Sequence, residues 1–389
     1  MRRDKTAEKT ITVIGGGPSG MVAAISAAVQ GAKVRLIEKN DILGRKLLAT
    51  GNGRCNLTNT NCRDTEEILR FFAELGLLTR AETEGRVYPY SEQATAVQEA
   101  LISEMRSRKV EITCGREVLK IERADAGFRI LSNKDRLLSD AVILATGGKA
   151  GPQYGSTGDG YRFSKEFGHT IVRPMPSLVQ MVSDRPFFKA LKGVRAKGQA
   201  ELLRGNRVVD VEVGEIQFTE DGLSGICIFN LSKEYVHGDI IRIDLFPEYH
   251  QESLEDILIS RATMLKSRSL SEFLNGMLHK KLIPVLLTEL SLNEKRIVSE
   301  LKQEDLAAMG RILKGWTISI TGTKGWKEAQ VTAGGIDLAE VDLHTMESRL
   351  VSNLYFAGEL LNVDQKCGGY NLQWAWTSGR IAGKSAAMA

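Results

Sequence analysis

The sequence predicts an α/β fold in which a parallel-sheet domain is interrupted by a β-barrel-like insertion, and the insertion itself carries a small helical domain. Three observations predict this layout. A strand, a glycine-rich turn, a helix and a second strand follow one another over residues 10–38. Short alternating apolar runs fill residues 176–245, which is typical of antiparallel strands. Residues 251–313 then place Leu and Ile at the three- and four-residue spacing of helices.

The N-terminal segment has the order of a β-α-β unit, whose strands become parallel through a right-handed crossover. Its turn has the spacing Gly15-x-Gly17-x-x-Gly20 directly after the first strand. In such a turn the first glycine makes a tight bend, the second lets the backbone approach a pyrophosphate, and the third lets the helix pack on the strand. The helix opens with Pro18 and Ser19, so its free N–H groups and positive dipole end face the phosphates. We therefore predict a Rossmann-type dinucleotide-binding domain.

A carboxylate and two later strand ends indicate which dinucleotide binds. Glu38 ends the second strand, where the acidic residue of this fingerprint binds the ribose hydroxyls. One later apolar strand ends in Thr146-Gly147-Gly148 and another ends in Gly358-Glu359. Three such strand ends in one crevice exceed what NAD needs, so they favour FAD. No second complete fingerprint follows, and we expect NAD(P)H to dock transiently as the electron donor.

The spacing of apolar and turn residues elsewhere predicts helices over residues 66–75 and 94–108, a strand–turn–strand over 117–130, and a last helix from near Leu372. These elements suggest an interrupted domain order. The FAD-binding domain takes residues 1–175 and 346–389, the β-rich insertion takes residues 176–250 and 315–345, and the helical domain takes residues 251–314.

Composition excludes several classes of protein. The net charge is only +4, from 52 basic and 48 acidic residues, and no long Lys/Arg run indicates a strong nucleic-acid surface. The five cysteines are odd in number and irregularly spaced, so neither a disulfide framework nor a zinc site is expected. The five histidines show no metal-ligating pairing either. No apolar stretch is long enough to cross a bilayer. We expect a cytoplasmic protein with reduced thiols, no metal and no membrane partner.

Longer motifs carry a family resemblance. They are GRKLLATGNGRCNLTN at residues 44–59, ATGG at 145–148 with GSTGDG at 155–160, and GE at 358–359 with GGYNLQ at 368–373. GLSG at 222–225, VTAGG at 331–335 and MES at 346–348 add to them. Together they resemble the signature of the BaiN/RdsA family of flavoproteins over almost the whole chain. Asn362, Gln365 and the Ile226-Cys227 pair depart from the family pattern.

The resemblance implies non-covalent FAD, electrons from NADH or NADPH, and one of three activities. The first is reduction of C=C bonds in 3-oxo bile-acid intermediates. The second is reduction of a uridine in 23S ribosomal RNA to dihydrouridine, and the third is oxidation of a small amine such as aminoacetone.

The loop after the second strand supplies the other expected cofactor contacts. Arg45 and Lys46 are placed to neutralise phosphate charge, while the loop beyond them is expected to hydrogen-bond the flavin ring. We thus expect the cofactor to contact Gly15, Gly17, Pro18, Ser19, Gly20, Glu38, Lys39, Arg45, Lys46, Thr50, Gly51, Asn52, Gly53, Val118, Thr146, Gly147, Gly148, Gly358, Glu359, Asn371 and Leu372.

Three residues are candidate catalytic groups. Cys55 is a candidate general acid, with a packing role as the alternative. Arg54 would lower its thiol pKa or hold an oxyanion. Tyr370, at the start of the last helix, would donate a proton or bind a substrate carbonyl, with a core aromatic role as the alternative. Cys367 is a second candidate thiol.

Enones and uracil share one chemical demand, a C=C bond conjugated to a carbonyl. Reduction then requires hydride at the β carbon, stabilised charge on the oxygen and a proton. We predict a reductase of such bonds acting on a small molecule, first a 3-oxo-Δ4/Δ6 steroid or bile acid. Ribosomal RNA is the alternative partner, amine oxidation is a third reaction, and a flavin-binding redox sensor is the non-enzyme alternative.

Overall fold

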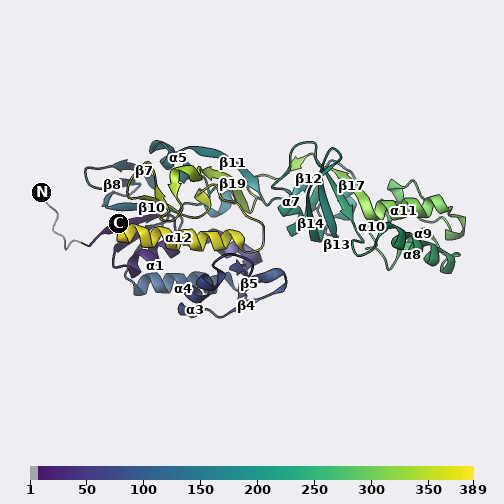
Figure 1. Cartoon of the computed structure of the whole chain (residues 1–389), viewed down its shortest axis with the longest axis horizontal. Helices are drawn as coiled ribbons and strands as arrows, with labels where there is room; N and C mark the ends of the chain where they lie inside the picture. Colours follow the sequence, from purple (N-terminus) through teal and green to yellow (C-terminus); the bar gives the residue numbers. More distant parts are fainter. Residues whose placement is uncertain (1–7) are drawn as a thin grey trace. The chain divides into compact units, whose positions relative to one another are not determined.

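The computed structural model describes residues 8–389, and these form two compact units (Figure 1). The first unit runs to Ser177 and resumes at Trp326–Ala389, and the second is Leu178–Gly325. The interrupted order expected from the sequence is therefore present. No helix among residues 8–389 combines the length and apolar character that a membrane crossing requires.

The first unit is built on a seven-stranded sheet with the order β20-β21-β22-β10-β1-β2-β6. Its central strands are parallel, and Ile14 of β1 lies opposite Ile37 of β2 and Leu144 of β10. The carboxyl ends of these three strands therefore meet at one edge of the sheet. The strands are β1 (Thr10–Ile14), β2 (Lys33–Ile37), β6 (Glu111–Thr113), β10 (Ala141–Leu144), β20 (Val341–Asp342), β21 (Glu347–Ser348) and β22 (Leu354–Phe356).

Two helices far apart in sequence, α1 (Pro18–Val29) and α12 (Tyr370–Met388), pack closely against each other in this unit. Glycines make the approach possible. A Cβ added at Gly379 would lie 2.4 Å from the carbonyl oxygen of Ser19, and one at Gly383 would lie 2.2 Å from that of Ala23. The packing fixes both helices against the core of the sheet, where Ile11, Val13 and Trp376 are fully buried.

Smaller elements surround this sheet. α3 (Thr65–Glu74) and α4 (Ala94–Ser107) lie where helices were predicted, and β7 (Val118–Arg123) pairs with β8 (Phe128–Ser132) as the predicted strand–turn–strand. The others are α2 (Arg45–Ala49), η1 (Thr50–Gly53), β3 (Thr58–Asn59), β4 (Thr79–Ala81), β5 (Arg86–Pro89), β9 (Arg136–Ser139), η3 (Pro152–Tyr154), α5 (Asp159–Glu166), β11 (Ile171–Ser177), β19 (Val331–Ile336), η5 (Leu338–Glu340) and η6 (Gly358–Leu360).

The second unit has its own seven-stranded antiparallel sheet, with the linear order β17-β16-β13-β14-β15-β12-β18. The insertion is thus an antiparallel sheet, where the sequence predicted a barrel. Its strands are β12 (Met181–Val182), β13 (Arg195–Arg204), β14 (Arg207–Phe218), β15 (Gly222–Ser224), β16 (Ile240–Asp244), β17 (Trp316–Ser319) and β18 (Gly322–Thr323).

The helices of the second unit share one hydrophobic core with this sheet. Leu258, Phe273 and Leu313 of the helices are buried in the same cluster as Ile216 and Ile241 of the strands. Residues 251–314 are therefore not a separate compact unit, although they are helical as predicted. The helices are α6 (Phe188–Leu191), α7 (Ile226–Leu231), α8 (Gln251–Met264), α9 (Leu270–Leu274), α10 (Leu282–Glu289), η4 (Val298–Glu300) and α11 (Gln303–Gly315).

The return from the second unit to the first lies earlier than the sequence suggested. Residues 326–345 were assigned to the insertion, but they belong to the first unit. The cause is long-range pairing, because β19 pairs antiparallel with β11, and Ile171 lies opposite Ile336.

Candidate active site

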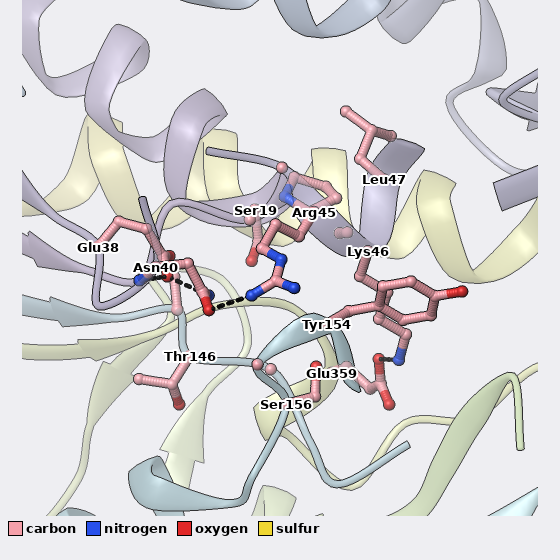
Figure 2. Close-up of a pocket in the computed structure, with 18 of the residues that line it drawn as sticks. Ser19, Glu38, Asn40, Arg45, Lys46, Leu47, Thr146, Tyr154, Ser156 and Glu359 are labelled. Carbon is pink, nitrogen blue, oxygen red and sulfur yellow. Dashed lines mark hydrogen bonds and ion pairs between the residues drawn. The ribbon is translucent and has the colours of Figure 1, made fainter. Parts of the chain in front are cut away.

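A cavity opens in the first unit where the carboxyl ends of β1, β2 and β10 meet, the usual ligand position in open parallel sheets (Figure 2). Its empty volume, counted out to the solvent opening, is about 1250 Å³. Fifteen of the twenty-one predicted cofactor residues line it. They are Gly15, Gly17, Pro18, Ser19, Glu38, Lys39, Arg45, Lys46, Thr50, Val118, Thr146, Gly147, Glu359, Asn371 and Leu372.

The glycine-rich turn has the geometry that a diphosphate needs. A Cβ at Gly17 would meet no atom within 4 Å, so a side chain there would project into the cavity. Gly17 is also the N-cap of α1 and has no capping side chain, which leaves the first-turn N–H groups free to bind an anion. Gly20 does not line the cavity. A Cβ there would lie 1.9 Å from the carbonyl oxygen of Gly15, so its role is to let the helix pack.

Glu38 is buried and oriented by its neighbours (Figure 2). Its Oε2 accepts a hydrogen bond from the backbone N–H of Gly16 at 2.7 Å. Its Oε1 accepts from the backbone N–H of Asn40 at 2.8 Å and from Asn40 Nδ2 at 2.6 Å. A carboxylate has about four lone-pair sites, so acceptor capacity remains for ribose hydroxyls.

Of the four cationic residues that line the cavity, Lys39, Arg45 and Lys46 each contact another segment of the chain, as does Arg116. Lys46 pairs with Glu359 at 2.6 Å (Figure 2). Arg45 donates to Asn40 Oδ1 at 2.8 Å and to the carbonyl oxygen of Gln153 at 3.1 Å. The third cation, Lys39, pairs with Asp159 and donates to Thr157 Oγ1 at 2.6 Å. Positive charge therefore gathers where a diphosphate would lie.

The second glycine-terminated strand end presents an unsatisfied hydroxyl. Thr146 lines the cavity, and its buried Oγ1 has no hydrogen-bond partner among residues 8–389. Buried polar atoms are normally satisfied, so a ligand group is the natural partner. Together with the open space at Gly17 and the carboxylate of Glu38, this fits FAD. Gly148 and Gly358 do not line the cavity. Added Cβ atoms there would clash with Thr332 Oγ1 at 2.3 Å and Ser19 Oγ at 2.5 Å.

The loop expected to reach the flavin ring contributes only its first residue to the cavity wall. Thr50 lines the cavity, whereas Gly51, Asn52 and Gly53 do not. Gly51 and Asn52 both have a φ of 57°, so the loop turns sharply away from the wall. Asn371 and Leu372 of α12, two of the expected cofactor contacts, also line the cavity. The Asn371 amide also holds the preceding loop, since it accepts from the Gln365 N–H at 2.9 Å.

The structure does not bring the three predicted catalytic groups onto the cavity wall. Cys55 is fully buried in the hydrophobic core, and burial raises the pKa of its thiol to about 12. A core packing role therefore describes Cys55 better than proton donation. Arg54 pairs with Glu82 at 3.3 Å, and Tyr370 is half-buried at the start of α12. Cys367 lies nearer the cavity, with Sγ 3.5 Å from Oε1 of the cavity residue Gln330.

Sequence reasoning missed several cavity residues. Gly155, Ser156 and Asp159 lie in the noted motif GSTGDG and Tyr154 directly precedes it, so the proximity of this motif to the second strand end could have identified them. No local signal identifies Gln330 or Val363, which reach the cavity through tertiary packing. The missed wall residues are Ile14, Ile37, Asn40, Gly44, Leu47, Arg116, Glu117, Ala145, Tyr154, Gly155, Ser156, Asp159, Phe163, Gln330, Val331, Val363, Trp374 and Ala375.

A Rossmann-type sheet with a cavity fitted to an adenine dinucleotide defines the class of this protein as a dinucleotide-binding one. Residues 9–69 and 61–385 match the family described as HI0933-like protein Rossmann domain, and the chain belongs to that family. It is accordingly an FAD-dependent oxidoreductase, as the resemblance to BaiN/RdsA proteins predicted.

Characterised relatives and a solved structure extend this placement. The chain is 40% identical to the 3-dehydro-bile acid delta(4,6)-reductase of Clostridium scindens, over 97% of this chain and 98% of the relative. It is 29% identical to the ribosomal RNA dihydrouridine synthase of Escherichia coli, over 94% and 95%. In fold it resembles 3-ketosteroid-delta4-(5alpha)-dehydrogenase of Rhodococcus jostii RHA1, with a TM-score of 0.53, 15% identity and 98% coverage of each chain.

Proposed function

We propose that the protein reduces a C=C bond conjugated to a carbonyl in a 3-oxo-Δ4/Δ6 steroid or bile acid, with NAD(P)H as the electron donor. The observation that carries this proposal is the 40% identity, over nearly both whole chains, to a bile-acid reductase. No disulfide joins any of the five cysteines, all of which lie within residues 8–389, and this supports a reducing, cytoplasmic setting.

Different residues of the cavity bind different parts of the cofactor. The first-turn amides of α1, with Arg45, bind the diphosphate, and Glu38 binds the ribose hydroxyls. Thr146 Oγ1 donates to the cofactor as its missing partner. FAD, once reduced by the nicotinamide, supplies the hydride that adds to the β carbon. The protein must then stabilise negative charge on the substrate oxygen and deliver a proton to the α carbon.

The proposal is tested by mixing anaerobically reduced holoenzyme with two acceptors in separate experiments. We expect 3-oxochol-4-enoic acid to restore the oxidised flavin spectrum, and an unmodified 23S ribosomal RNA fragment to leave the reduced spectrum unchanged. Reoxidation by the RNA alone would overturn the substrate class. Reoxidation by neither would favour a redox sensor over a reductase of this kind.

Uridine reduction in ribosomal RNA is the second candidate, because the synthases match over 94–95% of the chains. The second unit carries a loose group of basic residues that offers little to an RNA backbone, namely Arg261, Lys266, Arg268, Lys280 and Lys281. Arg261 donates to the carbonyl oxygens of Phe273 and Asn275 at 2.7 Å, and Arg268 pairs with Glu272 at 3.2 Å. These guanidinium groups serve the fold of their own unit, so we place the RNA reaction second.

A further inference from the structure

Arg116 is a buried arginine in the cavity wall, in the short segment between β6 and β7. Only 6% of its surface is exposed. The next two residues, Glu117 and Val118, continue the wall, and Val118 is buried as well. Arginine is rarely buried this deeply unless it is paired, so both its protein partners and the part of it that faces the cavity need an explanation.

Backbone hydrogen bonds hold this segment against the end of β2. The Glu38 N–H donates to the carbonyl oxygen of Thr113 at 2.9 Å, and the Arg116 N–H donates to the carbonyl oxygen of Glu38 at 3.0 Å. The Gly115 N–H donates to the carbonyl oxygen of Asn40 at 2.9 Å. Arg116 therefore lies directly beside the residue that is placed to bind the ribose hydroxyls.

The order of the strands determines which part of the cofactor meets Arg116. In the sheet, β2 lies between β1 and β6. The glycine-rich turn follows β1 and contacts Glu38 from one side, through the N–H of Gly16, and Arg116 follows β6 and contacts Glu38 from the other side. In an adenine dinucleotide the ribose joins the diphosphate to the base. With the diphosphate at the glycine-rich turn and the ribose at Glu38, the base falls on the side of Arg116.

The hairpin between β8 and β9 holds one edge of the Arg116 guanidinium. Nε donates to Ser132 Oγ at 3.2 Å, and Nη2 pairs with Asp135, whose carboxylate balances the charge. Nη1 forms no hydrogen bond with residues 8–389. Because the Nε–Nη2 edge is occupied, Arg116 offers a ligand in the cavity its planar face and Nη1.

A fixed planar cation suits an aromatic base. The guanidinium group is flat and weakly hydrated and stacks on aromatic rings, which the ammonium group of lysine cannot do in the same way. The buried side chain of Val118 adds apolar surface to the same stretch of wall. A purine ring that leaves water gains contact with both.

We propose that Arg116 recognises the adenine base of FAD through the plane of its guanidinium group, and this inference rests on the cofactor binding proposed above. Ser132 and Asp135 position the group before the cofactor binds. The contact makes the cavity selective for an adenine nucleotide, whereas the glycine-rich turn and Glu38 would accept any ribonucleoside diphosphate.

The test measures by calorimetry how tightly the full chain, freed of FAD, binds ADP and UDP. The two ligands share the ribose and the diphosphate and differ only in the base. Arg116→Met removes the cation, and Arg116→Lys keeps the positive charge but removes the plane. The control is Arg129→Met on β8, which alters an exposed ion pair of the same small sheet, 3.7 Å from Glu122 and outside the cavity wall.

We expect wild type and Arg129→Met to bind ADP more tightly than UDP. Both Arg116 variants should bind ADP and FAD about 5- to 30-fold more weakly, as for the loss of a desolvated cation from an aromatic ring, and should bind UDP as wild type does. Equal losses for ADP and UDP, ADP affinity retained in Arg116→Lys, or a wild type without preference for ADP would overturn the adenine contact alone. A wild-type chain that binds neither FAD nor ADP would overturn the cofactor binding itself.

Discussion

Glu38 meets the cavity with both carboxylate oxygens already oriented by backbone and side-chain donors of Gly16 and Asn40. Because these donors are fixed before the cofactor arrives, the cost of ordering the carboxylate is met by folding and not by binding. The fingerprint made Glu38 predictable from the sequence. The orienting Asn40 was not predictable, because its function depends on the bend that follows β2.

Replacing Glu38 with Gln should weaken FAD binding by roughly 10- to 100-fold, since hydrogen bonds to a charged group contribute about 1.5–3 kcal/mol. The new amide would also place a donor against the N–H groups of Gly16 or Asn40. Fluorescence titration of the apoprotein with FAD measures the loss. Glu111 on β6 forms an ion pair with Arg35 on β2, and Glu111→Gln is the control that should bind FAD as wild type does. Equal affinity in the two variants would refute the ribose role.

His169 is a second residue whose hydrogen bonds determine its protonation state, which can be tested by measurement. Ser348 Oγ accepts from the backbone N–H groups of Leu350 and Val351, so it must donate its own hydrogen to His169 Nε2, 2.8 Å away. His169 Nδ1–H then donates to Glu340 at 3.2 Å. The imidazole is therefore neutral in the fold, and burial lowers its pKa against the opposing charge of Glu340.

Stability should consequently depend on the protonation of His169. Above an unfolded-state pKa of about 6.5 the histidine is neutral in both states and its contribution is complete. Below that pH the unfolded chain takes up a proton more readily than the folded one, so stability falls. Urea unfolding at pH 8 and pH 5.5 should show a smaller pH-dependent loss in His169→Gln than in wild type, although the variant is about 1–3 kcal/mol less stable at pH 8. His344 is exposed, so His344→Gln should lose as much stability with falling pH as wild type does. An equally large pH-dependent loss of stability in His169→Gln would contradict the account.

At the scale of elements, the segment between β10 and α5 closes one side of the cavity. Tyr154, Gly155, Ser156 and Asp159 line the wall there, and Lys39 at the end of β2 pairs with Asp159. Gly151 and Gly155 of this segment have φ values of 73° and 97°. Glycine adopts these left-handed conformations readily, so the two glycines determine the backbone course of the segment. Polar contacts then hold the segment against the cavity.

Loss of the Lys39–Asp159 pair should speed the release of FAD. The two side chains are 28% and 33% exposed, so the pair should contribute about 0.5–1 kcal/mol, equivalent to a release about two to five times faster in Lys39→Met or Asp159→Asn. Stopped-flow dissociation in excess competing apoflavoprotein measures it. The double variant should release FAD no faster than either single variant. Additive effects would show that Lys39 acts on the diphosphate directly. The control is Arg162→Met, which breaks the exposed pair of Arg162 with Glu166 on α5.

At the scale of the whole molecule, the sequence predicted what local spacing determines. The glycine turn, the order of β1, α1 and β2, and the glycine-terminated ends of β10 and β22 were all predictable, because parallel strands bring their carboxyl ends to one edge. Long-range pairing was not predictable. The pairing of β11 with β19 moved the domain boundary, and the stacking of Arg54 on Tyr88 joined two segments that no local pattern connects. The cavity was therefore predictable at its glycine-rich turn and not in the wall residues that only tertiary packing brings to it.

The measurement that tests the central claim most directly is a single turnover of the reduced, FAD-bound enzyme with 3-oxochol-4-enoic acid under anaerobic conditions. The account predicts that one equivalent of steroid restores the oxidised flavin spectrum and that mass spectrometry finds the steroid with two additional hydrogens. A flavin that stays reduced, or one that reoxidises while the steroid mass stays unchanged, would contradict it.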